Sequence, residues 1–177
     1  LLAFGPRTRD NSKESGSVGS IGGGFVMAAL VLAAALAVLG AEKTLDGKSI
    51  ELKAPRGGIL AVVYYSSECP ISNGVSPELI AIAKAAPAGR LRMVGICVDF
   101  DADEAALRDH AAEYKLNYPC VADRSGRLVR MFGGTMTPEA VVVDDRGTVL
   151  YRGRINDDYL ERGKRNATPR VKDFRDA

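Results

Sequence analysis

Residues 59–70 have the sequence ILAVVYYSSECP, which predicts a buried β-strand followed directly by a helix. Seven consecutive apolar or aromatic residues, several of them β-branched, are typical of a strand that is covered on both faces. Small polar residues then end the strand. Pro70 fits the first turn of a helix because its φ is preset and it needs no hydrogen-bond donor. This order of elements places Cys69 at the N-cap of the helix.

A cysteine at a helix N-cap is expected to be reactive. Free backbone N–H groups and the positive end of the helix dipole favour the thiolate there. The thiolate, not the thiol, is the nucleophile in redox chemistry. Cys69 is therefore the first candidate catalytic residue. The alternative is a structural cysteine in a loop that joins a strand to a helix.

The composition limits the classes of partner and site that this chain can be expected to have. The chain has 177 residues, which is enough for one domain with a core. Its formal net charge of +2 offers no electrostatic case for a nucleic-acid partner. The single histidine, His110, lies in a charged helical segment. It has no second histidine at ligand spacing, so we expect a solvated surface residue and no metal site. The three cysteines contain no CxxC pair and form no disulfide scaffold. No cofactor is expected.

The N-terminal part of the chain predicts a targeting segment. Residues 1–20 are polar and rich in glycine and serine, which predicts disorder. Residues 21–41 include an uncharged apolar run that suits either a secretory signal or a membrane anchor, since a bilayer span needs about 20 apolar residues. We expect a folded domain over residues 42–177. It would lie outside the cytoplasm, periplasmic or secreted, and touch a membrane only through the N-terminal segment.

The elements expected after residue 42 alternate between strands and helices. Strands are expected at 49–52, 59–65, 91–100, 118–122, 140–143 and 148–153, and helices at 70–86, 103–115 and 126–132. Thr168 and Pro169 predict the start of a closing helix, which we expect to be truncated. Right-handed crossovers between these strands make the centre of the expected sheet parallel. The last two strands add an antiparallel hairpin at one side. The prediction is a three-layer α/β domain, with a mixed central sheet and helices on both faces.

The chain resembles the thioredoxin-fold redoxins, and in particular the alkyl hydroperoxide reductase/thiol-specific antioxidant group, which is peroxiredoxin-like. Three features carry the resemblance: Cys69-Pro70 at the start of a helix, Pro77 inside that helix, and Thr137-Pro138 before a strand. Residues 69–73 and 151–157 also resemble exported bacterial redoxins. The resemblance implies a thioredoxin-like fold in which the Thr137–Pro138 bond is cis and lies beside the reactive sulfur.

The sequence also departs from these families. In thioredoxins and disulfide reductases a second cysteine follows three residues after the first, and here that position is Ser72. A dithiol cycle within one CxxC motif is therefore excluded. Peroxiredoxins carry a Pro-x-x-x-Thr-x-x-Cys pattern, where this chain has Val62 and Ser66 in place of the proline and threonine. They also use an arginine to polarise the peroxide, and Arg152 and Arg154 are the candidates to replace it.

The resemblance implies a thiol-dependent oxidoreductase with an antioxidant or thiol–disulfide exchange role. Cys69 would attack a peroxide or a client protein disulfide and form a sulfenic acid or a mixed disulfide. Either Cys120 or an external thiol reductant would regenerate it, because an oxidising compartment permits a Cys69–Cys120 disulfide. Cys97 lies inside a predicted strand and is expected to be a buried structural residue.

Further residues are candidates to assist Cys69. The candidate catalytic residues beside it are Ser66, Thr137 and Pro138, and the candidate supporting residues are Ser72, Glu139 and Arg154. Ser66 has two possible roles. It hydrogen-bonds the sulfur or a bound peroxide, or its only role is to end the strand. Glu139 either carries a proton or is an exposed edge carboxylate. Arg154 shares one strand face with Arg152. These two arginines form either a docking patch for anions or the solvated face of a hairpin.

Two other classes of function compete with the enzyme. A thioredoxin-fold binding or assembly module outside the cytoplasm would need no resolving cysteine and would recognise clients near Pro138. A copper-handling protein of this fold would need a second cysteine close to Cys69 and a partner histidine, and the sequence offers only His110, on a predicted helix. We therefore expect the thiol enzyme, with the binding module as the alternative.

Overall fold

A mixed five-stranded sheet lies at the centre of the protein, in a computed structural model that describes residues 40–161, 164–166 and 171–177. The elements are β1 (Ala41–Lys43), β2 (Ser49–Glu51), β3 (Ile59–Tyr65), α2 (Pro70–Ala85), β4 (Leu91–Cys97), α3 (Glu104–Glu113), β5 (Cys120–Ala122), α4 (Arg127–Phe132), β6 (Glu139–Asp144), β7 (Val149–Gly153), β8 (Tyr159–Glu161), β9 (Lys164–Arg165) and α5 (Asp173–Asp176).

The strand order in the central sheet is β5-β4-β3-β6-β7. β3 pairs with β4 in parallel, and β4 pairs with β5 in parallel. β6 runs antiparallel to both β3 and β7. The predicted parallel centre with an antiparallel hairpin at one side is therefore confirmed.

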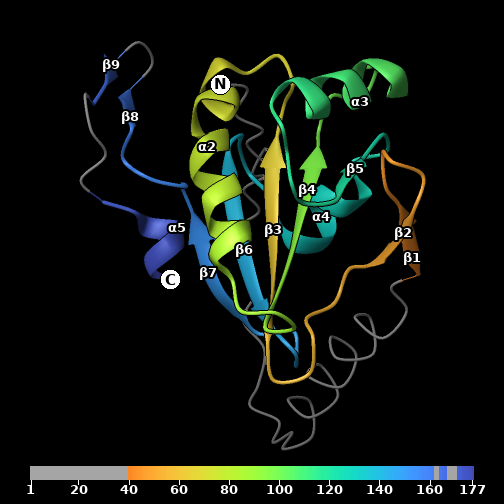
Figure 1. Cartoon of the computed structure of the whole chain (residues 1–177), viewed down its shortest axis with the longest axis vertical. Helices are drawn as coiled ribbons and strands as arrows, with labels where there is room; N and C mark the ends of the chain where they lie inside the picture. Colours follow the sequence, from red (N-terminus) through yellow and green to blue (C-terminus); the bar gives the residue numbers. More distant parts are fainter. Residues whose placement is uncertain (1–39, 162–163, 167–170) are drawn as a thin grey trace, which may run out of the picture.

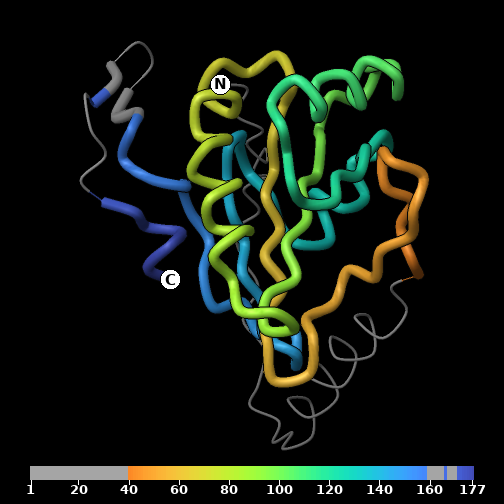
Figure 2. Tube along the Cα trace, viewed as in Figure 1, coloured from red at the N-terminus to blue at the C-terminus, as the bar shows by residue number. Residues whose placement is uncertain are grey.

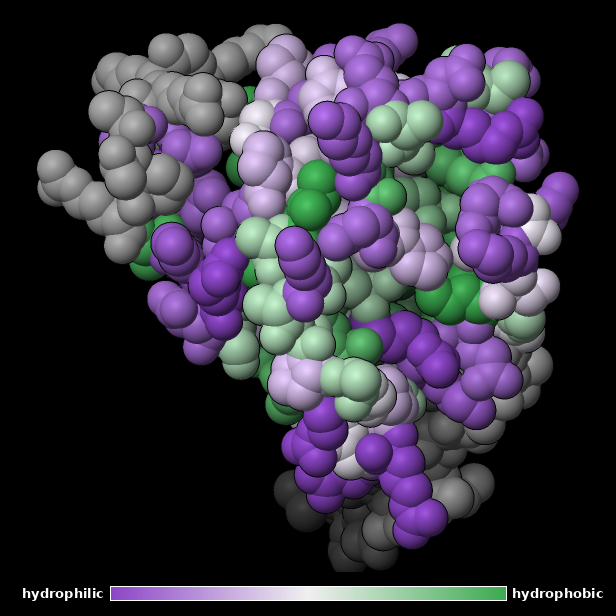
Figure 3. Space-filling model, viewed as in Figure 1, coloured by the Kyte–Doolittle hydropathy of each residue, from purple (hydrophilic) through white to green (hydrophobic). Residues whose placement is uncertain are grey.

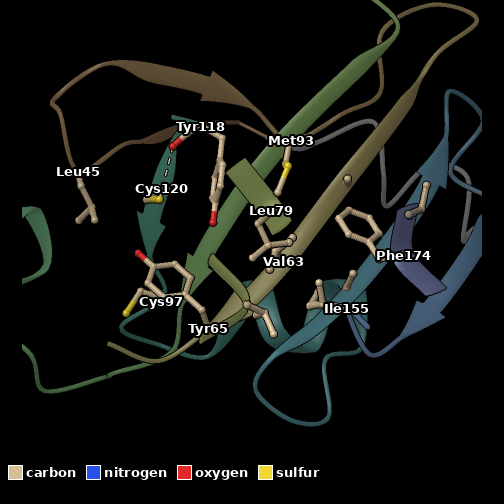
Figure 4. Close-up of a cluster of buried hydrophobic side chains, with 14 of the residues drawn as sticks. Leu45, Val63, Tyr65, Leu79, Met93, Cys97, Tyr118, Cys120, Ile155 and Phe174 are labelled. Atoms are coloured by element: carbon tan, nitrogen blue, oxygen red, sulfur yellow. Dashed lines mark hydrogen bonds between the residues drawn. The ribbon is translucent and has the colours of Figure 1, made fainter. Parts of the chain in front are cut away.

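Helices cover both faces of this sheet (Figure 1). Alternate residues of β3 point to opposite faces, so Val63 packs in one buried cluster and Val62 in the other. The first cluster includes residues of α2, α3 and α5, and Figure 4 shows Leu79 and Phe174 from two of these helices around Val63. The second cluster includes Leu128 from α4. The three-layer architecture expected from the sequence is present.

The β1–β2 hairpin lies at one side of the domain, beyond β4 and β5 (Figure 2). Its turn is joined to the sheet because the Leu45 N–H donates to the Cys120 carbonyl at 2.8 Å. Figure 3 shows hydrophilic residues around the rim of the viewed face and hydrophobic residues between α2 and this hairpin. β1 begins at Ala41, so the last residue of the predicted N-terminal segment belongs to the folded domain.

Several element bounds differ from the prediction. β4 ends at Cys97 rather than Phe100, because Asp99 turns away to bind the backbone of the neighbouring loop. β5 begins only after Pro119, which has no N–H to offer to a ladder. The predicted disordered and targeting segments before residue 40 and the helix start at residues 168–169 lie outside the described residues. Across the described part of the chain, no helix has both the length and the apolar character needed to cross a membrane.

Candidate active site

Cys69 caps the N-terminus of α2, as the sequence predicts. Its backbone is extended, with φ −85° and ψ 111°, and Pro70 follows as the first helical residue. The Cys69 carbonyl accepts the first helical hydrogen bond from the Asn73 N–H at 3.0 Å. The Cys69 side chain is half-buried, whereas the neighbouring Glu68 is exposed. The thiol is therefore accessible at the end of the sheet where β3 joins α2.

The surroundings of Cys69 favour its thiolate. Partial burial raises the pKa of the thiol, but hydrogen bonds outweigh this effect and the pKa lies below its ordinary value. The donors are the Ser72 N–H, the Ser72 hydroxyl, the Ile71 N–H and the Thr137 hydroxyl, in that order of effect. The two N–H groups belong to the first turn of α2 and have no partner within the helix. A lowered pKa increases the thiolate fraction at neutral pH.

Ser72 takes the place that a second cysteine would have. It is a buried residue of α2. Its Oγ accepts a long hydrogen bond from the Ser66 N–H at 3.5 Å, and the same hydroxyl donates toward Cys69. The position from which a CxxC cysteine would attack is thus occupied by a hydroxyl, which can stabilise the Cys69 thiolate but cannot form a disulfide.

The loop before β6 carries a second part of the site. The Thr137–Pro138 peptide bond is cis, as the resemblance implied. Glu139 follows directly, and its side chain is buried rather than exposed at an edge. Its carboxylate accepts hydrogen bonds from the Thr135 N–H at 2.7 Å and the Thr135 hydroxyl at 3.0 Å. The expectation of an exposed carboxylate is wrong because this bidentate contact closes the loop over it.

Ser66 directs its hydroxyl to the backbone and to a carboxylate. The Ser66 Oγ accepts from the Glu68 N–H at 3.3 Å and also hydrogen-bonds Asp99. Asp99 Oδ2 additionally accepts from the Ser67 N–H at 2.7 Å and the Ser67 hydroxyl at 2.6 Å. Burial raises the pKa of Asp99, but these hydrogen bonds outweigh burial and hold the pKa below its ordinary value. Asp99 therefore anchors the loop before Cys69, a role that the sequence did not suggest.

The other two cysteines are buried in the core. Burial raises the pKa of Cys120 to about 11 and that of Cys97 to about 12. Cys97 is packed in the first buried cluster, and its Sγ donates to Asp99 at 3.2 Å, which confirms the structural reading of this residue. All three cysteines are free thiols.

The sheet register separates Cys120 from Cys69. Cys120 pairs with Gly95 on β4, and Gly95 in turn pairs with Val63 on β3. These pairings place Cys120 two strand spacings, about 10 Å, from Val63 in β3. Cys69 lies farther along the chain, beyond the end of β3, and a disulfide requires Cα atoms within about 7 Å. The structure thus does not bring the candidate resolving cysteine to Cys69.

The two candidate arginines are bound elsewhere. Arg152 donates to the Phe132 carbonyl at 2.8 Å, at the end of α4. Arg154 pairs with Asp173 of α5 at 2.8 Å. Both guanidinium groups therefore hold neighbouring elements onto β7, and the hydrogen bonds at the Cys69 thiol come from other residues.

His110 is not the solvated surface residue that the sequence suggested. Its ring is stacked against Tyr65 and Tyr114, with centroid distances of 5.9 Å and 4.6 Å. Its Nε2 lies 2.9 Å from Oδ1 of Asn73, in the first turn of α2. No group of three His, Cys, Asp or Glu side chains in the described residues could hold a metal ion.

Comparisons with known proteins agree with this architecture. The model of the AhpC/TSA family matches residues 34–152. The thiol-disulfide oxidoreductase ResA of Bacillus thuringiensis subsp. konkukian is 22% identical over 127 residues, which are 71% of this chain and 72% of that protein.

Solved structures show the same fold. MTB dsbF, solved in its mixed oxidized and reduced forms, is 26% identical with a TM-score of 0.58, over 72% of this chain and 93% of that one. A secreted Mycobacterium tuberculosis disulfide oxidoreductase homologous to E. coli DsbE is 24% identical with a TM-score of 0.53, over 63% of this chain and 80% of that one.

Proposed function

This chain belongs to the AhpC/TSA family, and we propose that it is a thiol-dependent oxidoreductase in which Cys69 reduces client protein disulfides. The observation that carries the proposal is the Cys69 thiol at the N-cap of α2, with a lowered pKa and donors from both α2 and the Thr137 loop. The similar proteins named as thiol-disulfide oxidoreductase or disulfide oxidoreductase support the same chemistry. The binding module without turnover is less well supported, since it requires no activated thiol.

The reaction that fits this site uses one cysteine and external thiols. The Cys69 thiolate attacks one sulfur of the client disulfide, so a new S–S bond forms and the second client sulfur leaves as a thiolate that takes up a proton. An external thiol then attacks the Cys69 sulfur and releases the reduced client. A second external thiol attacks the resulting mixed disulfide and releases Cys69. In sum, one client disulfide is reduced and two external thiols become one disulfide.

The surrounding residues have distinct roles in this proposal. The Ile71 and Ser72 N–H groups and the hydroxyls of Ser72 and Thr137 stabilise the Cys69 thiolate. Ser72 also explains the need for external thiols, because it cannot resolve the mixed disulfide. Cys120 is buried on β5 and would reach Cys69 only after the domain opened.

Peroxide is the second candidate substrate. The same thiolate would attack one peroxide oxygen, break the O–O bond and become a sulfenic acid while hydroxide leaves. Arg152 and Arg154 are engaged with the Phe132 carbonyl and Asp173. Since neither arginine is available to polarise a peroxide without leaving its partner, the disulfide is the favoured substrate.

A location outside the cytoplasm fits this chemistry. One similar structure is a secreted disulfide oxidoreductase, and another is an exposed lipoprotein thioredoxin of Streptococcus pneumoniae strain TIGR4, 22% identical with a TM-score of 0.57 over 69% of this chain and 90% of that one. The apolar run within residues 21–41 would direct the chain there as a cleaved signal or hold it as an anchor. Client disulfides are abundant in such oxidising compartments.

The decisive experiment is mass spectrometry of each cysteine in the purified full chain, after titration with oxidised glutathione or with hydrogen peroxide. We expect rapid mixed-disulfide formation at Cys69 alone, slower sulfenic acid formation with peroxide, and no adduct on Cys69→Ser. Release of the adduct by added reduced glutathione would complete the cycle. A Cys69 that reacts no faster than an unperturbed thiol would rule out the enzyme and leave the binding module.

A further inference from the structure

His110 of α3 contacts the first turn of α2, the helix that begins after Cys69. Figure 1 shows α3 and the start of α2 at the same end of the sheet. His110 belongs to the last turn of α3, and its Nε2 lies 2.9 Å from Oδ1 of Asn73, one helical turn after Cys69. This contact joins α3 to the first turn of α2 at the point where the thiolate is stabilised.

Asn73 connects that contact to the loop before Cys69. Its side-chain Nδ2 donates to the Ser67 carbonyl at 2.9 Å, while its backbone N–H donates to the Cys69 carbonyl at 3.0 Å. The Asn73 amide therefore bridges the residues on both sides of the strand-to-helix turn. The bridge requires one orientation of the amide, with the NH₂ group toward Ser67 and the oxygen toward His110.

The protonation state of His110 fixes this orientation. Its Nδ1 is buried and has no hydrogen-bond partner among the described residues, so the neutral ring carries its proton on Nε2 and donates to Asn73. Burial lowers the pKa of His110, while Glu113 of α3 and Asp99 of the loop after β4 raise it by a smaller amount. The ring is therefore neutral at neutral pH. Its stacked neighbour Tyr65 of β3 is uncharged there, because burial raises the pKa of Tyr65.

We propose that His110 is a positioning residue for Cys69. Its Nε2–H orients the Asn73 amide, and this amide holds the Ser67 carbonyl and so keeps the loop aligned with the N–H groups of α2 that face the sulfur. The inference rests on the proposed function, because it assigns to His110 the task of keeping the thiol of that enzyme reactive. The isolated position of this histidine in the sequence gave no signal for the role.

The test is the pH profile of Cys69 alkylation by iodoacetamide in the full chain, followed by mass spectrometry of the Cys69 peptide. We expect His110→Leu to raise the apparent pKa of Cys69 and to slow alkylation at pH 7 about fivefold, the effect of losing one net hydrogen bond. At high pH, where the thiol is fully ionised, the rates should converge. His110→Gln keeps an N–H donor of similar reach and should restore most of the wild-type profile.

Asn73→Ala provides the second arm of the test. If His110 acts through Asn73, the Asn73→Ala variant slows alkylation at pH 7 and the added His110→Leu change has little further effect. Fully additive effects, or a His110→Leu profile equal to wild type, would overturn the proposal. If His110→Leu does not fold by circular dichroism, the comparison of His110→Gln with Asn73→Ala decides, and equal profiles for these two count against it.

If the proposed function is wrong, the alkylation profile of the wild-type protein shows it. In that case wild-type Cys69 itself titrates and reacts as an ordinary thiol. The positioning role is judged only from the differences between the variants and wild type. The two outcomes are thus read from separate comparisons in one data set.

Discussion

Glu139 accepts two hydrogen bonds from Thr135 and thereby closes the loop that carries Thr137, whose hydroxyl hydrogen-bonds Cys69, and the cis bond to Pro138. Glu139 is 4% exposed as a residue, so these hydrogen bonds are shielded from competing water. The geometry of this loop is thus held by Glu139, whose carboxylate binds Thr135.

The first prediction concerns Glu139→Ala. The change removes the acceptor of two hydrogen bonds from Thr135, and the net loss of two such bonds costs about 1–3 kcal/mol. We expect a loss of unfolding free energy in this range, measured by urea denaturation, together with slower alkylation of Cys69. Glu113→Ala, at an exposed position of α3, is the matched control and should change the stability by less than about 0.5 kcal/mol. Equal stabilities of the two variants would contradict the structural role of Glu139.

The second prediction concerns the hydroxyl of Thr137. This group lowers the pKa of Cys69 by hydrogen bonding, after the larger effects of Ser72 and Ile71. Thr137→Val keeps the shape and removes the donor, so the pKa of Cys69 should rise and the rate of its alkylation at pH 7 should fall about two- to fivefold. Thr148→Val, in the exposed turn between β6 and β7, should leave both quantities unchanged. An unchanged Cys69 pKa in Thr137→Val would remove Thr137 from the site.

The fold and the nucleophile could be predicted because their signals are local. The apolar run before Ser66 specifies a doubly covered strand, and Cys69-Pro70 specifies the start of a helix, so neither needs knowledge of distant contacts. The cis bond before Pro138 followed from the resemblance alone, through a proline at the expected place before a strand.

The contacts that position the nucleophile could not be predicted in the same way. The burial of Glu139 depends on how the loop folds back onto it, and an isolated glutamate after a proline does not reveal this. The contact between His110 and Asn73 depends on how α3 packs against the start of α2, which no sequence period encodes. The same holds for Cys120, whose distance from Cys69 is set by strand order.

The third prediction converts the site into a dithiol. The Ser72 hydroxyl faces the Cys69 thiol, and Ser72 is the third residue after it. Ser72→Cys should therefore form an intramolecular disulfide with Cys69 under mild oxidation, detected as a loss of two hydrogens in the intact mass and of reactivity toward iodoacetamide. Ser76→Cys, one turn further along the same buried face of α2, is the control and should leave Cys69 reactive. A Ser72→Cys variant that keeps both thiols under these conditions would show that the two side chains do not meet.

The fourth prediction is a pH dependence of stability that arises from Asp99. Its pKa is lowered in the folded protein, because the hydrogen bonds from Ser66 and Ser67 outweigh the opposite effect of burial. A carboxyl whose folded pKa is lowered contributes stability above its unfolded pKa, near 3.9, and this contribution is lost as the pH falls through the folded pKa. Asp99→Asn should therefore cost stability at pH 7 and progressively less below about pH 4.

The size of this effect is limited by the exposure of Asp99. Hydrogen bonds to a charged group contribute about 1.5–3 kcal/mol when buried, and partial solvent access reduces this to about 1 kcal/mol for Asp99. The measurement is the difference in unfolding free energy between wild type and Asp99→Asn at pH 7 and pH 3, which removes the contribution of all other carboxyls. Asp101→Asn, at an exposed position two residues later, is the matched control for the substitution itself. If the Asp99→Asn difference is the same at both pH values, the carboxylate does not anchor the Ser66–Ser67 loop through its charge.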